Sequence, residues 1–303
     1  MKLGNKKLVW LIYFLFIIAF VSMYLKQEIH PDTTIFISGF KDSAPERFIF
    51  PLLYYITIPI YNLFQEFAFI LIPFLCFFIG LHFLIKLFEH FNLNLLWIPG
   101  SFIALRLLGA GGSPIFLFSY TRDALMFALA SAFTYYFIVS YFNNHFHWKQ
   151  MLVLNILMIF NREMGIVFGL FFIVILTKKS WATISPMFTK ALTGIFLGFE
   201  NLQHFLQVGI NSFSSFKLEA LLSFARNPLY AFSLGAFLLK PTKLHLILIS
   251  VTIVLAYAIN NSSTLFSGVW VSFNGQEFRY LFSFFPMHLF FLAKTSKDFL
   301  LNA

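Results

Sequence analysis

The scarcity of charged side chains is the feature that most constrains the fold of this chain. Charged residues make up 11% of the 303 residues, whereas hydrophobic residues make up 59%. An average soluble domain carries roughly 25% charged residues, and a water-soluble globule of this size has more surface than so few charges can cover. This composition excludes a soluble enzyme, a DNA-binding module and a disordered chain. It predicts a polytopic membrane protein whose apolar surface is covered by lipid.

Several apolar segments approach the roughly 20 residues that a helix needs to cross a bilayer. The candidate spans are residues 8–25, 67–88, 94–109, 123–142, 185–199, 221–239, 244–260 and 281–296. Residues 48–63 contain two prolines and two adjacent tyrosines, which favours a helix lying in the membrane interface. Residues 151–177 are interrupted by Asn161-Arg162-Glu163. They form either one long span with a buried ionic centre or a tight hairpin of two short helices.

We therefore expect an all-α fold, a polytopic bundle of about 9–11 transmembrane helices. It is expected to form a single domain over residues 1–303, with the interfacial helix inside the first outer loop, residues 26–66. The start of the chain has the charge layout of a signal peptide, but its apolar run exceeds the usual length of about 7–15 residues and no small-residue cleavage site follows. We expect an uncleaved first span. The single cysteine, Cys76, excludes an intramolecular disulfide.

The placement of lysine and arginine selects a membrane topology. Three lysines precede the first span, which places the N-terminus in the cytoplasm by the positive-inside rule. If residues 48–63 lie on the outer surface and residues 151–177 form a hairpin, nine further lysines face the cytoplasm: Lys86, Lys149, Lys178, Lys179, Lys190, Lys240, Lys243, Lys294 and Lys297. All the arginines and ten of the twelve acidic residues then fall on the outer side. If residues 48–63 span the membrane instead, those nine lysines move outside and the usual bias of lysine toward the cytoplasm is reversed. We therefore prefer the first topology. The net charge of +9 then reflects lysines that face anionic lipid.

Four charged clusters are predicted to lie on the outer side. They are His30-Pro31-Asp32, Arg122-Asp123, Arg162-Glu163 and the pair Glu277 and Arg279. An aspartate fixed near the membrane surface by a proline suits a general base or a metal ligand, although both residues are also ordinary in turns. An aspartate at a helix start is favourable through capping alone, and arginine near a helix end can snorkel. Together the clusters describe a polar, arginine-rich cavity that is open to the outer leaflet.

The order of these clusters resembles the GT-C superfamily of membrane glycosyltransferases, which take sugars from polyprenyl-phosphate donors. Some eukaryotic mannosyltransferases of that superfamily carry His-Pro-Asp-Glu in the first lumenal loop, where this chain has His30-Pro31-Asp32-Thr33. The runs SPIFLFSYTRDALMFALA, FNREMGIVFGLFFIVIL and EFRYLFSFFPMHLFFLA are similar to later segments of the family. The resemblance covers residues 1–177 and then 275–295, and residues 178–270 match only as generic spans.

The resemblance implies a role for each cluster. Asp32 would be the catalytic base that activates the acceptor. The residues that would bind the substrate and its phosphate are Arg47, Arg122, Asp123, Arg162, Glu163, Glu277 and Arg279. Because the family's glutamate is replaced by threonine, metal dependence is left open, and His30 and Asp42 are secondary candidates. No cofactor is implied beyond a divalent metal.

The sequence thus predicts an enzyme, a hexosyltransferase-type glycosyltransferase at the outer face of a bacterial inner membrane. Its expected partners are a lipid-linked sugar donor, membrane lipid and an envelope-biosynthesis complex, with no nucleic acid. The alternative is a transporter, flippase or polymerase subunit that handles lipid-linked sugars. The histidines His82, His90, His204 and His288 are scattered along the chain and predict no shared site.

Overall fold

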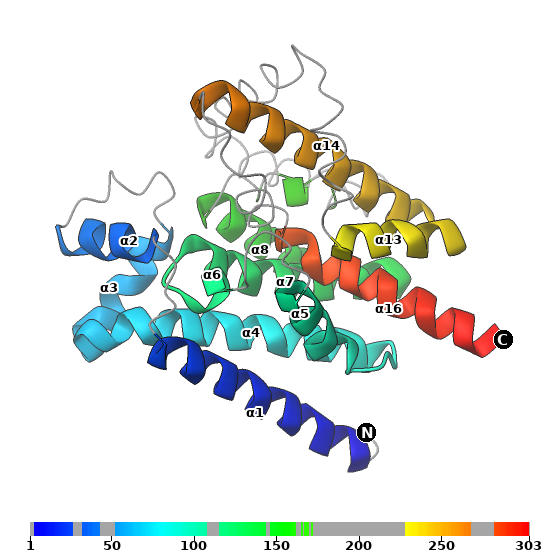
Figure 1. Ribbon diagram of the computed structural model, residues 1–303, viewed down its shortest axis with the longest axis horizontal. Helices are drawn as coiled ribbons and strands as arrows, with labels where there is room; N and C mark the ends of the chain where they lie inside the picture. Colours follow the sequence, from blue (N-terminus) through cyan, green and yellow to red (C-terminus); the bar gives the residue numbers. More distant parts are fainter. Residues whose placement is uncertain are drawn as a thin grey trace. The chain divides into compact units, whose positions relative to one another are not determined.

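The computed structural model describes residues 3–26, 32–42, 52–107, 115–143, 146–161, 165, 167–169, 171, 228–267 and 282–302. Throughout these ranges all regular structure is helical, and no strand occurs in them, so the all-α fold is confirmed for the described residues (Figure 1). The chain divides into two compact units. Unit 1 comprises Met1–Leu15, Ile85–Pro114 and Phe205–Ala303, and unit 2 comprises Phe16–Leu84 and Ile115–His204.

Three helical segments are long and apolar enough to cross a membrane: Lys6–Leu25, Leu52–His90 and Arg122–Phe142. They contain the predicted spans 8–25, 67–88 and 123–142. Four further predicted spans, 94–109, 221–239, 244–260 and 281–296, each overlap a helix that is not among these three segments, namely α5 (Trp97–Leu107), α13 (Pro228–Leu239), α14 (Lys243–Ser267) and α16 (Phe285–Asn302). The predicted span 185–199 lies outside the described residues.

Unit 2 is organised around α7 (Arg122–Phe142), most of whose residues are buried. Helix α1 (Leu3–Leu25) packs its second half on α4 (Ala68–His90), where the ring of Phe20 lies 5.2 Å from that of Phe74. Helix α8 (Trp148–Asn161) lies against α7. Because α7 is covered on several sides, its alanines and phenylalanines form the core of this unit.

Within the segment 48–63, the described residues belong to a short helix, α3 (Leu52–Phe64), where the sequence analysis predicted an interfacial helix. The backbone of Gln65 has a φ of 50°, which interrupts the apolar run before α4 begins. The 13 residues of α3 extend about 20 Å, which is less than the ~30 Å thickness of a bilayer core. Helix α3 folds beside the start of α4, since the ring of Tyr61 lies 5.5 Å from that of Phe69.

The segment 151–177 reverses direction after Asn161. The side-chain amide of Asn155 donates a 2.7 Å hydrogen bond to the carbonyl oxygen of Gly165, ten residues later. Ten residues of continuous helix would separate these two positions by about 15 Å. Residues 155–165 therefore do not form one continuous helix, which contradicts an uninterrupted helical span and favours the hairpin alternative; residues 172–177 lie outside the described residues. A Cβ atom at Gly165 would meet main-chain atoms of Met158 and Ile159, so this close return requires a glycine.

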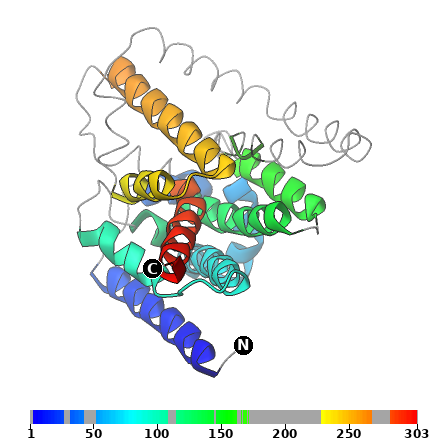
Figure 2. The ribbon, with the colours of Figure 1, turned by 90° about the vertical axis from the view of Figure 1, so that its right-hand side faces the viewer.

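Unit 1 packs α16 against α13 and α5, and α14 against α13 (Figure 2). Phe102 of α5 contacts Phe285 at the start of α16, with ring centroids 5.1 Å apart. At the opposite end of α16, the ammonium group of Lys297 donates a 3.0 Å hydrogen bond to the carbonyl oxygen of Phe91. These contacts hold α16 along its whole length.

Candidate functional site

The short junction formed by residues 118–122 connects α6 (Ile115–Phe118) to α7 and collects contacts from other helices of unit 2. The hydroxyl of Tyr24, near the end of α1, donates a 3.0 Å hydrogen bond to the carbonyl oxygen of Phe118. The hydroxyl oxygens of Tyr120 and Thr57 lie 2.5 Å apart, which connects the junction to α3. The junction therefore lies where the end of α1 and the middle of α3 meet.

The direction of the Tyr120–Thr57 hydrogen bond follows from the bonds around it. The Thr57 hydroxyl donates its one proton to the carbonyl oxygen of Leu53, at 2.7 Å, so Tyr120 must be the donor to Thr57. Burial raises the pKa of the Tyr120 phenol above its ordinary value, which keeps the donor protonated. The junction is thus fixed by directed, buried hydrogen bonds.

Arg122 is the half-buried first residue of α7 and links two other segments to the junction. Its guanidinium carbon lies 5.4 Å from the centroid of the Phe36 ring, a cation–π contact. Phe36 belongs to α2 (Asp32–Lys41), one helical turn after Asp32, the first residue of that helix. The main-chain oxygen of Arg122 accepts a 2.9 Å hydrogen bond from the amide of Asn161, the last residue of α8.

The structure thereby joins Arg122 to two residues that are close in sequence to other predicted clusters, Phe36 and Asn161. The start of α2 carries Asp32, the start of α7 carries Arg122 and Asp123, and Asn161 immediately precedes Arg162-Glu163. Asp123 is buried in the first turn of α7, where the helix dipole favours a negative charge. Of the sequence-predicted site residues, those outside the described ranges are His30, Arg47, Arg162, Glu163, Glu277 and Arg279.

Helix α2 is held at its far end as well. Phe40 contacts Tyr61 of α3 and Phe69 of α4, with ring centroids 5.1 Å and 5.7 Å away. The ammonium group of Lys41 lies 2.8 Å from a carboxylate oxygen of Glu66. Contacts near both ends therefore fix how α2 lies across the junction.

A metal ion shared by Asp32 and Asp42 does not fit α2. The two residues are ten positions apart, at the beginning and just past the end of this helix, and about 15 Å apart along its axis. That separation exceeds the reach of two aspartates to one ion, whose bonds are about 2.0–2.6 Å. Asp42 therefore cannot replace the missing motif glutamate as a second ligand beside Asp32. Among the described residues, no group of three or more His, Cys, Asp and Glu could hold a metal ion.

Two buried oxygens near these segments have no hydrogen-bond partner among the described residues. They are the hydroxyl of Thr33, next to Asp32, and the amide oxygen of Asn161. Buried polar atoms in native proteins are nearly always hydrogen-bonded.

Unit 1 contains a buried histidine pair that the sequence analysis missed. The Ser233 hydroxyl oxygen lies 2.9 Å from Nε2 of His245 and 2.7 Å from Nδ1 of His288. Nε2 of His288 lies 2.9 Å from the Thr252 hydroxyl oxygen, and all four side chains are fully buried. The sequence analysis considered only His82, His90, His204 and His288, whereas the partner of His288 in this network is His245. No sequence spacing signals this pair, because His245 and His288 lie on different helices.

The directions of the hydrogen bonds in this network follow from Thr252, because the acceptor of its hydroxyl proton is known. Thr252 donates to the carbonyl oxygen of Leu248, at 2.7 Å, so it accepts from Nε2–H of His288. Nδ1 of His288 then accepts from Ser233, and Ser233 accepts from Nε2–H of His245. Nδ1 of His245 has no hydrogen-bond partner among the described residues. Because burying a charge is costly, both imidazoles are assigned as neutral in this arrangement, and the network joins α13, α14 and α16 as a structural element.

No protein-family model, curated protein or solved structure in the comparisons matches this chain.

Proposed function

We propose that this protein is an integral membrane glycosyltransferase that transfers a sugar from a polyprenyl-phosphate donor to an acceptor hydroxyl. The observation that carries the proposal is the contact of the Arg122 guanidinium with Phe36, one turn from Asp32. This contact connects Arg122, which is suited to bind the donor phosphate, with α2, the helix that begins with Asp32, the proposed base. The bond from Asn161 to Arg122 supports it further, because Arg162 and Glu163 follow Asn161 directly.

The proposed reaction uses these residues in three coupled changes. Asp32 accepts the proton of the acceptor hydroxyl, whose oxygen attacks the anomeric carbon of the sugar. The bond between that carbon and the phosphate oxygen breaks, and its electron pair leaves with the lipid phosphate. Arg122 stabilises the negative charge that develops on that phosphate. Arg47, Arg162 and Arg279 are proposed as further phosphate ligands, with Asp123, Glu163 and Glu277 orienting them or binding sugar hydroxyls.

The setting of Arg122 suits this role. Stacking on the Phe36 ring restricts a flexible side chain, so less conformational entropy is lost when a phosphate binds. The guanidinium also lies at the first residue of α7, where the helix N-terminus contributes partial positive charge. A phosphate bound here would be stabilised by both groups.

The proposal places the junction at the outer face of a bacterial inner membrane, with the N-terminus in the cytoplasm. Asp42 is exposed at the end of α2, so a cysteine introduced there should react with an impermeant maleimide added from outside. Cys76 is buried and gives little background in this assay. Reaction only after the membrane is opened would contradict the proposed orientation.

The experiment that tests the function is sugar transfer by the purified protein in lipid vesicles that contain a polyprenyl-phosphate sugar. The Asp32→Asn variant should lose about 100–1,000-fold in rate. Asp298→Asn removes a carboxylate of unit 1 and should transfer at the wild-type rate. Wild-type transfer by Asp32→Asn would remove Asp32 from the mechanism. Movement of the lipid-linked sugar across the vesicle without transfer would instead favour a flippase or transporter.

A further inference from the structure

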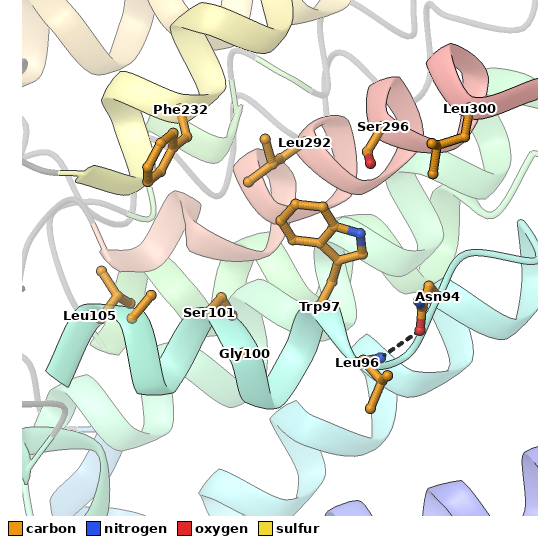
Figure 3. A pocket seen from close by; sticks show the side chains of 11 residues that line it. Asn94, Leu96, Trp97, Gly100, Ser101, Leu105, Phe232, Leu292, Ser296 and Leu300 are labelled. Atoms are coloured by element: carbon orange, nitrogen blue, oxygen red, sulfur yellow. Dashed lines mark hydrogen bonds between the residues drawn. The ribbon is translucent and has the colours of Figure 1, made fainter. Parts of the chain in front are cut away.

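A groove with a volume of about 530 Å³ lies between α5 and α16 in unit 1 (Figure 3). Trp97 and Gly100 of α5, Leu292 of α16 and Phe232 of α13 line it, and Figure 3 shows the Trp97 indole reaching from α5 toward α16. The volume falls within the roughly 300–1,000 Å³ of small-molecule sites. A Cβ atom at Gly100 would have no neighbour within 4 Å, so the space beside this glycine is open.

The rim of the groove is apolar and exposed. Leu96, Phe232 and Leu300 are 55%, 58% and 74% exposed. Large apolar side chains gathered around an open groove mark a surface that an apolar molecule covers. Trp97 is half-buried among them, in the manner of tryptophans where hydrocarbon meets polar groups. The groove is therefore suited to a hydrocarbon chain.

Two polar residues, Asn94 and Ser296, line the groove beside Leu96 and Leu300, and a cationic cluster follows Ser296 in α16 without lining the groove. Its first member, Lys297, donates a 3.0 Å hydrogen bond to the carbonyl oxygen of Phe91. One turn of α16 away, the ammonium groups of Lys240 and Lys294 lie 2.6 Å and 3.3 Å from the same oxygen of Asp298. Two of these ammonium groups pair with the single carboxylate of Asp298, whereas Lys297 bonds a neutral carbonyl oxygen, so the three lysines and Asp298 together carry a net positive charge next to Ser296.

We propose that this groove binds one acyl chain of an anionic glycerophospholipid, with the headgroup phosphate at Lys297. An apolar groove beside a cationic cluster is complementary to an anionic amphiphile, whose hydrocarbon chain and charged headgroup match the two parts. The nine residues from Trp97 to Leu105 extend about 12 Å along α5, which accommodates a large part of one acyl chain. The site uses residues of unit 1 alone and is independent of the proposed sugar transfer.

Trp97 makes the proposal directly testable through quenching of its fluorescence by brominated acyl chains. The protein would retain Trp97, with phenylalanine replacing Trp10, Trp148, Trp181 and Trp270. Vesicles would contain phosphatidylcholine with a small fraction of brominated phosphatidylglycerol or, separately, of brominated phosphatidylcholine. Phosphatidylglycerol should quench Trp97 with about fivefold higher apparent affinity, the effect expected of one lysine near an anionic lipid. Lys297→Gln should remove that preference.

Two glycines provide a matched pair of variants. Gly100→Phe would fill the groove and should lower quenching by brominated phosphatidylglycerol severalfold. Gly235 of α13 also has open space around it but does not line the groove, so Gly235→Phe should leave the quenching unchanged. If the single-tryptophan protein does not fold, native mass spectrometry of the wild-type protein with both lipids gives the same comparison.

Three results would overturn the proposal. Equal quenching by the two brominated lipids would show that the groove has no preference for an anionic headgroup. Unchanged quenching in Gly100→Phe would show that no acyl chain enters the groove. Displacement of brominated phosphatidylglycerol by polyprenyl phosphate, but not by unlabelled phosphatidylglycerol, would assign the groove to the tail of a polyprenyl lipid instead.

Discussion

The side-chain amide of Asn161 donates a 2.9 Å hydrogen bond to the main-chain oxygen of Arg122, 39 residues earlier in the chain. This bond joins the last residue of α8 to the first residue of α7. The guanidinium of the same Arg122 stacks on Phe36 of α2. Arg122 therefore contacts two distant segments at once, through its backbone and through its side chain.

The bond from Asn161 can be tested by removing its donor. Asn161→Ala should lower the free energy of unfolding by about 0.5–1.5 kcal/mol, because the part-buried hydrogen bond to the carbonyl oxygen of Arg122 is lost. Thermal unfolding in detergent measures the change. Gln150→Ala, at an exposed position of α8, is the control. Equal effects of the two substitutions would show that this bond does not stabilise the junction.

The buried histidine network predicts a large difference between two serine substitutions. Ser233→Ala should cost about 2–4 kcal/mol of unfolding free energy, because Nε2–H of His245 and Nδ1 of His288 both lose their partner. Ser131 is equally buried in α7, but its hydroxyl has no hydrogen-bond partner among the described residues. Ser131→Ala should therefore be close to neutral. Chemical denaturation measures the free energy of unfolding of the two variants. A Ser233→Ala substitution that leaves this free energy unchanged would contradict the network.

The reversal after Asn161 predicts opposite effects for two glycine-to-alanine substitutions. Gly165→Ala should destabilise the protein by about 1–3 kcal/mol, because the new methyl group meets the main chain of Met158 and Ile159. Gly235→Ala enters open space within a helix and should stabilise by about 1 kcal/mol. Thermal unfolding of the two variants measures these changes in stability. A stabilising Gly165→Ala would mean that the chain does not return this closely against α8.

The ion pairs at the end of α16 predict a pH dependence. Burial raises the pKa of the Asp298 carboxyl, but the hydrogen bonds and charges of Lys240 and Lys294 outweigh it and hold the pKa below its ordinary value of 3.8. A carboxyl whose pKa is lowered in the folded state stabilises the protein above its unfolded pKa and loses that contribution as pH falls through the folded value. Asp298→Asn should therefore reduce thermal stability at neutral pH, and the difference should shrink below pH 3.8. A difference that is constant across this range would contradict the ion pairs.

Much of the helical fold follows from hydropathy, because long apolar runs leave few other structures in lipid. The start of α7 at Arg122-Asp123 and the separate helix in residues 48–63 could both be predicted. Hydropathy alone could not choose between a span and a hairpin in residues 151–177, since both bury the same side chains. That choice depends on the bond from Asn155 to Gly165, which is a tertiary contact.

The contacts within the candidate site were less predictable. Phe36 is one of 46 phenylalanines, and nothing in its local sequence distinguishes it as the partner of Arg122. His245 and His288 likewise come together only because α14 and α16 pack with Ser233 of α13 between their rings. The sequence predicts which helix ends carry charged residues. Which of those ends lie together depends on how the helices pack.

Sugar transfer by the purified Arg122→Gln variant, compared with Lys149→Gln, tests the central proposal most directly. Lys149 is an exposed cation of α8 beside the ring of Trp148, so its loss should leave the rate at the wild-type level. Arg122→Gln should transfer sugar from a polyprenyl-phosphate donor about 100–1,000-fold more slowly, because one preorganised phosphate contact is lost. Equal rates for Arg122→Gln and Lys149→Gln would contradict a phosphate-binding role for Arg122 and the function proposed from it.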